Sequence, residues 1–380
     1  MTEIVGVKTT GIYCLSSMCS GRPKPSNARR FTTAAAAEAA GLRPCHMCRP
    51  YRQDLMSTWV GTELICRAIR TILDGALHGG TEEELGAVLG VSARHLRRRF
   101  IEEVGVTPSQ LARSSRAHFA RRLIDDTDLT MTEIAFASGF GSVRQFNRTM
   151  SEIFREPPSK LRNRRRRTDR LVADGGLVVR MPHHPPLDIG VMMTSLRNQE
   201  IPGVESVSGG WYRRTVTIGN HAGVIEIGPG DIDDDLLLRL HLPHWEGLIH
   251  HVRRARRIVG LDHDHLTDGI RSRDAAVCRP GSVEVVPGTW DPFENSVREI
   301  VDRYHPKGPT EAVMGSLVSH LGEFVPGLGV LGLTHLFPTP RSLMRADELD
   351  IGLSRQGAAA LSRFARSVEN GSVKLDTIPA

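Results

Sequence analysis

Residues 9–50 of this chain read TTGIYCLSSMCSGRPKPSNARRFTTAAAAEAAGLRPCHMCRP and hold four of its six cysteines. The cysteines form two short-spaced pairs, Cys14 with Cys19 and Cys45 with Cys48, separated by a basic loop that contains proline. Two close thiolate pairs brought together from separate places make a tetrahedral all-sulfur site, the geometry that zinc prefers. The spacing therefore predicts one zinc ion per chain. Spacing alone favours a structural zinc ribbon over a reactive site, because closed four-cysteine sites are usually structural.

The residues around the cysteines are more specific than the spacing. The stretches TTGIYC (9–14) and RPCHMCRP (43–50) resemble the N-terminal zinc domain of the Ada DNA-alkylation response proteins. The resemblance implies that Cys14 is both a zinc ligand and the acceptor of a methyl group from a DNA methylphosphotriester. It also implies that Thr10 and Arg43 lie beside the DNA phosphate. The remaining ligands that it implies are Cys19, Cys45 and Cys48.

The charge of such a site suggests how methyl transfer could control DNA binding. A metal keeps a thiol deprotonated at neutral pH, and the thiolate is the nucleophile. Zinc with four thiolates carries a charge of about −2, and methylation of one sulfur leaves about −1. Because DNA phosphates then repel the site less, the reaction that repairs DNA also raises the affinity for it.

Composition limits the class of protein. A chain of 380 residues has room for two or three domains. Two cysteines outside the metal pattern make no disulfide framework, and neither a signal peptide nor a membrane-spanning stretch is visible, so we expect a cytoplasmic protein. Residues 1–170 carry 28 Lys and Arg against 17 Asp and Glu, whereas the rest carries 21 against 26. This basic excess predicts a nucleic-acid partner for the first half.

An internal repeat follows the zinc pattern. Thr81-x-x-Glu84 is a capping box, and Thr130-x-x-Glu133 repeats it about fifty residues later. Each copy continues with a Gly-containing turn and a second helix that begins after a serine, which predicts two helix-turn-helix units. Further helices are predicted over 34–40, 54–77 and from Thr107-Pro108 onward, the last of these joining the two units.

The second helix of each unit presents polar and basic side chains. Arg reads guanine and Gln or Asn reads adenine in the major groove, while other side chains on the same helix contact only phosphate. Residues 62–163 resemble the AraC-type DNA-binding domain, most specifically at IAFASGF (134–140). The candidate DNA-contacting residues are Arg94, His95, Arg98, Arg144, Gln145, Asn147 and Arg148.

The second half changes to a strand-rich pattern from residue 177, followed by helices predicted over 245–259, from 291, over 308–325 and over 354–370. The stretches IPGVE (201–205), YRR (212–214), PGTWDPF (287–293) and LTHLFP (333–338) resemble the 3-methyladenine DNA glycosylases of the helix-hairpin-helix class. The family's hairpin and catalytic aspartate would lie beyond residue 380, and its DNA-intercalating helix is replaced at 302–308. We therefore expect no base excision.

These inferences predict an α+β multidomain protein. Its expected parts are a small α/β four-cysteine zinc domain (1–53), an all-α double helix-turn-helix domain (62–163), an Arg-rich linker (164–176), a glycosylase-like α+β domain (177–285) and a truncated helical domain (286–380). The leading hypothesis is a DNA alkylation-response protein that accepts one methyl group irreversibly and regulates transcription. Its partner is double-stranded DNA, with RNA polymerase a candidate second partner, and neither a membrane nor a small-molecule ligand is expected. The alternatives are an AraC-type regulator with purely structural zinc, and an active glycosylase with an appended regulator.

Overall fold

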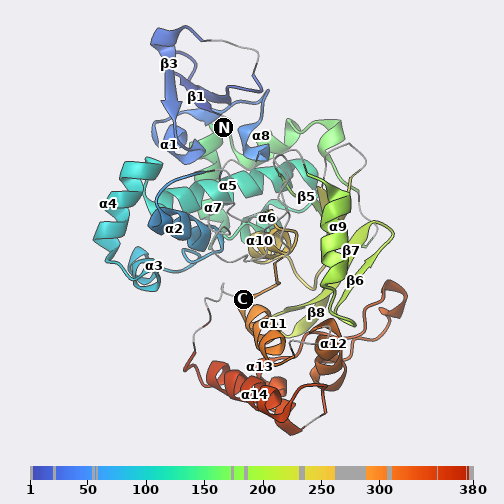
Figure 1. The fold of residues 1–380 in the computed structure, drawn as a ribbon. Coiled ribbons are helices and arrows are strands. Elements are labelled where there is room, and N and C mark those ends of the chain that lie inside the picture. Colours follow the sequence, from blue (N-terminus) through green and yellow to red (C-terminus); the bar gives the residue numbers. More distant parts are fainter. Residues whose placement is uncertain are drawn as a thin grey trace.

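The protein is a chain of mixed helices and strands in which helical and sheet-containing parts alternate (Figure 1). The structure is a computed structural model that describes residues 3–19, 23–53, 56, 59–172, 175–183, 187–230, 236–261, 288–305, 310–348, 350–373 and 375. The predicted fold class is confirmed. The predicted features at 262–287 and 376–380 lie outside the described residues.

The first part is a small four-stranded sheet with one helix, and its strand order is β3-β1-β2-β4. Burial alternates along β2, so that Tyr13 and Leu15 enter a small core while Cys14 lies on the other face. The predicted alanine-rich helix is present as α1, with Thr33 as its N-cap and Gly41 in the left-handed region just after it. The elements are β1 (Ile4–Val7), β2 (Ile12–Leu15), β3 (Ala28–Phe31), α1 (Ala34–Ala39) and β4 (Arg43–Pro44).

Seven helices then make up the region that contains the two helix-turn-helix units. Thr81 and Thr130 make the predicted capping boxes with Glu84 and Glu133, and these local hydrogen bonds fix the first helix of each unit. The second helix of each unit begins after a serine N-cap, as predicted. The helices are α2 (Glu63–Leu73), α3 (Glu82–Leu89), α4 (Ala93–Val104), α5 (Pro108–Asp126), α6 (Met131–Ala137), α7 (Val143–Phe154) and α8 (Pro158–Asn163).

Helix α5 joins the two units, as expected from its predicted start at Thr107-Pro108. Its N-terminal part places Leu111 in the core of the first unit, whereas Phe119 and Leu123 lie in a second core with the helices of the second unit. One 19-residue helix therefore runs through both cores and connects them.

The bounds of one helix in the first unit differ from the prediction. The helix expected over 54–77 is α2, which begins only at Glu63 and ends at Leu73. Gly61 stands before this helix, and Gly75, in the left-handed region, follows it. The prediction rested on apolar residues spaced three and four apart, and it extended the helix too far in both directions.

The second half contains a five-stranded antiparallel sheet in the order β5-β9-β8-β7-β6, with further helices around it. The helix predicted over 245–259 begins only at Leu248, because Gly247 before it adopts a left-handed conformation. The helix predicted over 308–325 ends earlier than predicted, at Leu321. The elements are β5 (Leu177–Arg180), α9 (Ile189–Asn198), β6 (Glu205–Ser208), β7 (Trp211–Ile218), β8 (His221–Pro229), β9 (Leu236–His241), α10 (Leu248–Ile258), α11 (Pro292–Tyr304), α12 (Thr310–Leu321), α13 (Pro340–Leu343) and α14 (Arg355–Glu369).

The two halves share one apolar core rather than meeting at a thin boundary. Phe146 of α7, Val179 of β5 and Ile249 of α10 all belong to one contiguous cluster. The Arg-rich stretch between the halves is packed on the second unit, where Arg165 and Arg170 pair with Asp128. No helix in the described part of the chain is long and apolar enough to cross a membrane.

Candidate zinc centre and DNA-binding surface

The four cysteines meet at one place. Their Sγ atoms all lie within 4.8 Å of one another. A tetrahedral zinc site with Zn–S bonds of about 2.3 Å places its sulfurs roughly 3.8 Å apart, so the four thiols fit one zinc ion. Cys14 lies on β2. Four residues separate it from Cys19, against two between Cys45 and Cys48, and they form a turn in which the Cys19 amide donates to the Leu15 carbonyl. Cys45 and Cys48 follow β4, which pairs with β2.

Burial divides the four sulfurs into two kinds. Cys45 and Cys48 are buried, whereas Cys14 and Cys19 are both partly exposed. The hydrogen bond from the Cys14 thiol lowers the pKa of Cys48 to about 6, and the same bond, with burial, raises the pKa of Cys14. Cys14 therefore resists losing its proton once Cys48 is ionised, and a cation among the sulfurs removes that penalty.

The two residues expected beside the DNA phosphate lie near Cys14. Thr10 is exposed in the turn between β1 and β2, and its hydroxyl lies 3.4 Å from the Val7 carbonyl oxygen to which it donates. Arg43 of β4 is partly exposed and pairs in register with Ile12, which shares a face of β2 with Cys14. Thr10 therefore precedes the strand that carries Cys14, and Arg43 lies on the strand paired with it.

The candidate base-reading residues lie on the outer faces of α4 and α7. On α4 the side chains of Arg94, His95 and Arg98 are exposed, while Arg99 pairs with Glu102 and Glu103.

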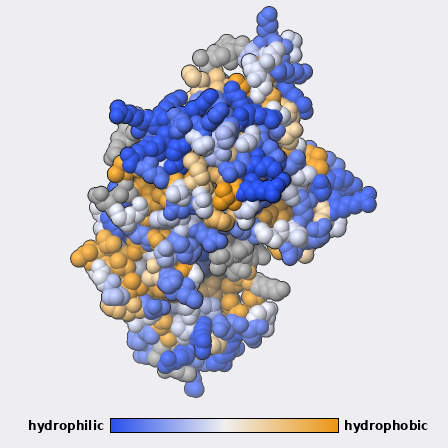
Figure 2. Space-filling view, turned by 180° about the vertical axis from the view of Figure 1, so that it is seen from behind, coloured by the Kyte–Doolittle hydropathy of each residue, from blue (hydrophilic) through white to orange (hydrophobic). Residues whose placement is uncertain are grey.

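On α7 the exposed side chains are Arg144, Asn147 and Arg148. Gln145 is partly exposed and its amide oxygen accepts from the Gly141 N–H at 3.2 Å, so it supports the turn of the unit. Figure 2 shows hydrophilic side chains spread over the upper part of the rear face, above the more apolar middle.

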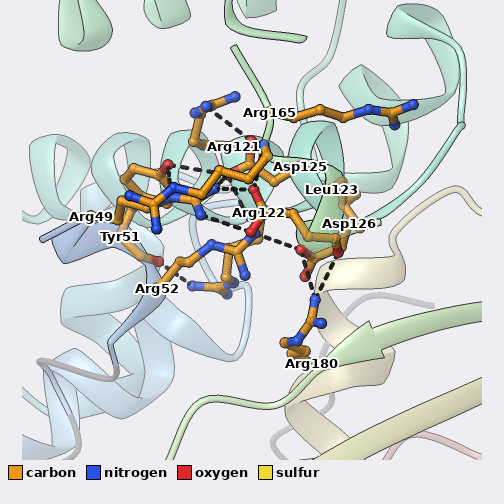
Figure 3. A network of polar contacts seen from close by, with 12 residues as sticks. Arg49, Tyr51, Arg52, Arg121, Arg122, Leu123, Asp125, Asp126, Arg165 and Arg180 are labelled. Carbon is orange, nitrogen blue, oxygen red and sulfur yellow. Dashed lines mark hydrogen bonds and ion pairs between the residues drawn. The ribbon is translucent and has the colours of Figure 1, made fainter. Parts of the chain in front are cut away.

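The zinc centre is tied to the helical part by a buried polar network that the sequence did not indicate (Figure 3). Arg49, directly after Cys48, adopts a left-handed conformation and aims its guanidinium inward. Its nitrogens contact carboxylate oxygens of Asp125 on α5 at 2.5 Å and Asp169 at 2.7 Å. Asp126 beside them binds Arg180 of β5 at 3.2 Å. One buried group of charges therefore joins the zinc domain, α5 and the second half.

A single sequence signal could have indicated this network. Asp125 and Asp126 stand side by side at the end of α5, directly after Leu123 and Ile124, and are almost fully buried. Buried carboxylates need cationic partners, but nothing in the sequence says that Arg49, 76 residues away, supplies one.

Family comparisons cover most of the chain. Residues 3–51 match the metal binding domain of Ada, residues 85–164 match a helix-turn-helix domain, and residues 178–291 match the AlkA N-terminal domain. A probable bifunctional transcriptional activator/DNA repair enzyme AlkA from Mycobacterium tuberculosis is 31% identical over 380 residues, covering 98% of this chain and 76% of that protein. The chain belongs to this family.

Two further relatives of this AlkA-family chain match a smaller share of it. The bifunctional transcriptional activator/DNA repair enzyme AdaA of Bacillus subtilis is 29% identical over 41% of this chain and 72% of its own length. Ada of Escherichia coli is 28% identical over 39% of this chain and 41% of its own length. Together with the four-cysteine cluster, these findings establish that this AlkA-family protein is a zinc-containing, DNA-binding transcriptional activator and DNA repair protein.

Proposed function

We propose that Cys14 of this AlkA-family protein takes a methyl group from a DNA methylphosphotriester and keeps it. The observation that carries the proposal is the partly exposed Cys14 sulfur, which lies in a four-thiol cluster on the strand flanked by Thr10 and Arg43. A bound zinc ion supplies the deprotonated, electron-rich thiolate. The proposed remaining ligands are Cys19, Cys45 and Cys48.

The reaction is a direct displacement at the methyl carbon. The Cys14 sulfur donates an electron pair to form the S–CH₃ bond, and the O–CH₃ bond of the phosphotriester breaks. The phosphate oxygen leaves with the bonding electrons, which restores an anionic phosphodiester, and no proton is transferred. Arg43, as a cation beside the site, favours the charge that develops on this oxygen. Because the thioether product is stable, each chain reacts once.

The test is stoichiometric modification of the zinc-loaded full chain. We expect incubation with methylphosphotriester DNA to add about 14 mass units, one methylene, to Cys14. Cys14 and Cys19 share one tryptic peptide, but cyanogen bromide cleavage after Met18 separates them, so the modified sulfur can be assigned. Arg43→Gln should slow the transfer, whereas Arg29→Gln, an exposed arginine on β3, should react at the wild-type rate.

The second candidate function is regulation with a purely structural zinc ion. It is favoured by the burial of Cys45 and Cys48, which resembles a closed structural site. A protein that holds one zinc ion per chain and stays unmodified would establish this alternative. Methylation of Cys19 in place of Cys14 would reassign the acceptor. The expected lack of base excision stays a prediction, and assaying free 3-methyladenine released from alkylated DNA is its direct check.

A further inference from the structure

The zinc domain contacts the C-terminal end of the first recognition helix, α4. The last carbonyls of a helix have no partner within it, and the Val104 carbonyl accepts hydrogen bonds from Thr32 at 2.9 Å and Thr33 at 3.2 Å. Gly105 follows in the left-handed region, and a Cβ there would lie 3.2 Å from the Cβ of Ala36 on α1. The zinc domain is therefore seated closely against this helix end.

The same domain contacts the end of the second recognition helix, α7. Arg155, the residue after α7, is in the left-handed region and donates from its guanidinium to the Gly41 carbonyl at 3.0 Å. Phe154, the last residue of α7, packs edge-on against Tyr51 with ring centroids 5.7 Å apart. Both recognition helices thus end against the zinc domain.

Helix α1 lies between these two contacts. Thr32 and Thr33 precede it and Gly41 follows it, and its six residues span only about 9 Å. Its small side chains allow close packing on two sides, since Ala35 lies in the core of the first unit and Ala37 in the core of the zinc domain.

Glu38 of α1 also accepts from Tyr13 at 2.7 Å and lies 2.6 Å from the His118 ring nitrogen on α5. Tyr13 is the neighbour of Cys14 on β2, so α1 is fixed both to the strand that carries a candidate zinc ligand and to the helix that joins the two units. Figure 1 shows the small sheet and α1 seated above α5.

We propose that the zinc domain sets the separation of the two recognition helices and thereby the spacing of the two DNA sites that the protein reads. Two units that bind successive segments of one duplex must match the DNA repeat, so a rigid spacer raises affinity for one spacing and lowers it for others. The proposal uses only the helix-turn-helix units and the fold of the zinc domain. It does not depend on methyl transfer.

The test variant combines Thr32→Val with Arg155→Asn in the zinc-loaded full chain. Valine keeps the shape of the exposed threonine and removes its hydroxyl, and asparagine tolerates the left-handed conformation of Arg155 without reaching Gly41. Thr33 is left unchanged because its side chain caps α1.

The matched control combines Thr62→Val with Arg113→Asn. The Thr62 hydroxyl bonds Glu103 of α4 at 2.9 Å, and Arg113 pairs with Glu152 of α7 at 2.8 Å. The control therefore removes one hydroxyl that contacts α4 and one positive charge that pairs with α7, without touching the zinc domain.

The probe is an unmethylated duplex selected from a random library by the wild-type protein, together with versions carrying one base pair more or less between the half-sites. We expect the test variant to bind the selected duplex about fivefold more weakly and to lose most of its preference for that spacing, while the control keeps the preference. Zinc content should remain one per chain in both variants. An unchanged spacing preference in the test variant overturns the proposal, and so does an equal loss of affinity for a duplex with a single half-site, which would report impaired folding instead.

Discussion

Acidification should destabilise the junction between the two halves through a pair of buried histidines on α10. His250 and His251 are each 7% exposed, and burial lowers the pKa of His250 to about 3 and that of His251 to about 4. Charge repulsion from neighbouring basic side chains lowers the pKa of His250 further. These neighbours are His78, His251, Arg254 and Arg116. The His250 Nε2 lies 3.1 Å from the His78 Nδ1, while its own Nδ1 has no partner among the described residues.

The size of the effect follows from these values. A histidine in the unfolded chain takes up a proton near pH 6.5, whereas these two stay neutral when folded until the pH approaches 4 or 3. Their contribution is therefore fully present above pH 6.5 and is lost progressively as the pH falls toward those values. Each pH unit in this window costs about 1.4 kcal/mol per histidine, so each loses about 2 kcal/mol and the pair about 4 kcal/mol at pH 5.

The assay is the free energy of urea unfolding measured from pH 7.5 to pH 5. His250→Gln keeps a polar group beside His78 but cannot titrate, so we expect it to lose only about half as much stability as the wild-type protein over this range. His221→Gln, at an exposed position where β8 begins, serves as the control and should follow the wild-type profile. Burial raises the pKa of Asp291, which acts in the opposite direction, but this carboxyl is common to all three proteins.

The comparison between variants gives the decisive result. Equal losses in the His250→Gln and wild-type proteins would falsify the assignment of the pH dependence to this pair. A wild-type unfolding free energy that does not change between pH 7.5 and pH 5 would show that the imidazoles accept protons without breaking the junction.

Three further outcomes are expected. Cys45→Ser should release the zinc ion and unfold the small domain, which metal analysis and circular dichroism would detect. Arg98→Ala and Arg144→Ala should weaken binding to the selected duplex more than to random DNA in a titration, because both side chains are exposed on recognition helices; equal losses would make them phosphate contacts. Arg214→Met should lower the unfolding free energy by about 3–5 kcal/mol in denaturant titrations, since it leaves the buried Glu205 and Glu294 without their cation. A near-neutral effect would mean that the two glutamates become protonated at little cost.

Local signals in the sequence predicted much of the fold. The capping boxes at Thr81 and Thr130 depend on residues three apart, so hydrogen bonds within one helical turn decide where those helices begin. Gly41, in the left-handed region after α1, is likewise a local signal, because it marks where that helix ends. The boundaries of α2 were missed because apolar spacing continues past the points where its backbone leaves the helix.

The sequence by itself determined the four thiols of the zinc centre, the two helix-turn-helix units and the polar faces of α4 and α7, since short-range spacing and periodicity encode each of them. Only the tertiary structure decided which polar groups meet. Arg49 contacts Asp125, 76 residues away in the sequence. Arg155 contacts the Gly41 carbonyl, 114 residues away, and His250 contacts His78, 172 residues away. These contacts have no sequence period, because they arise where separately folded elements pack together and buried polar groups must find partners there.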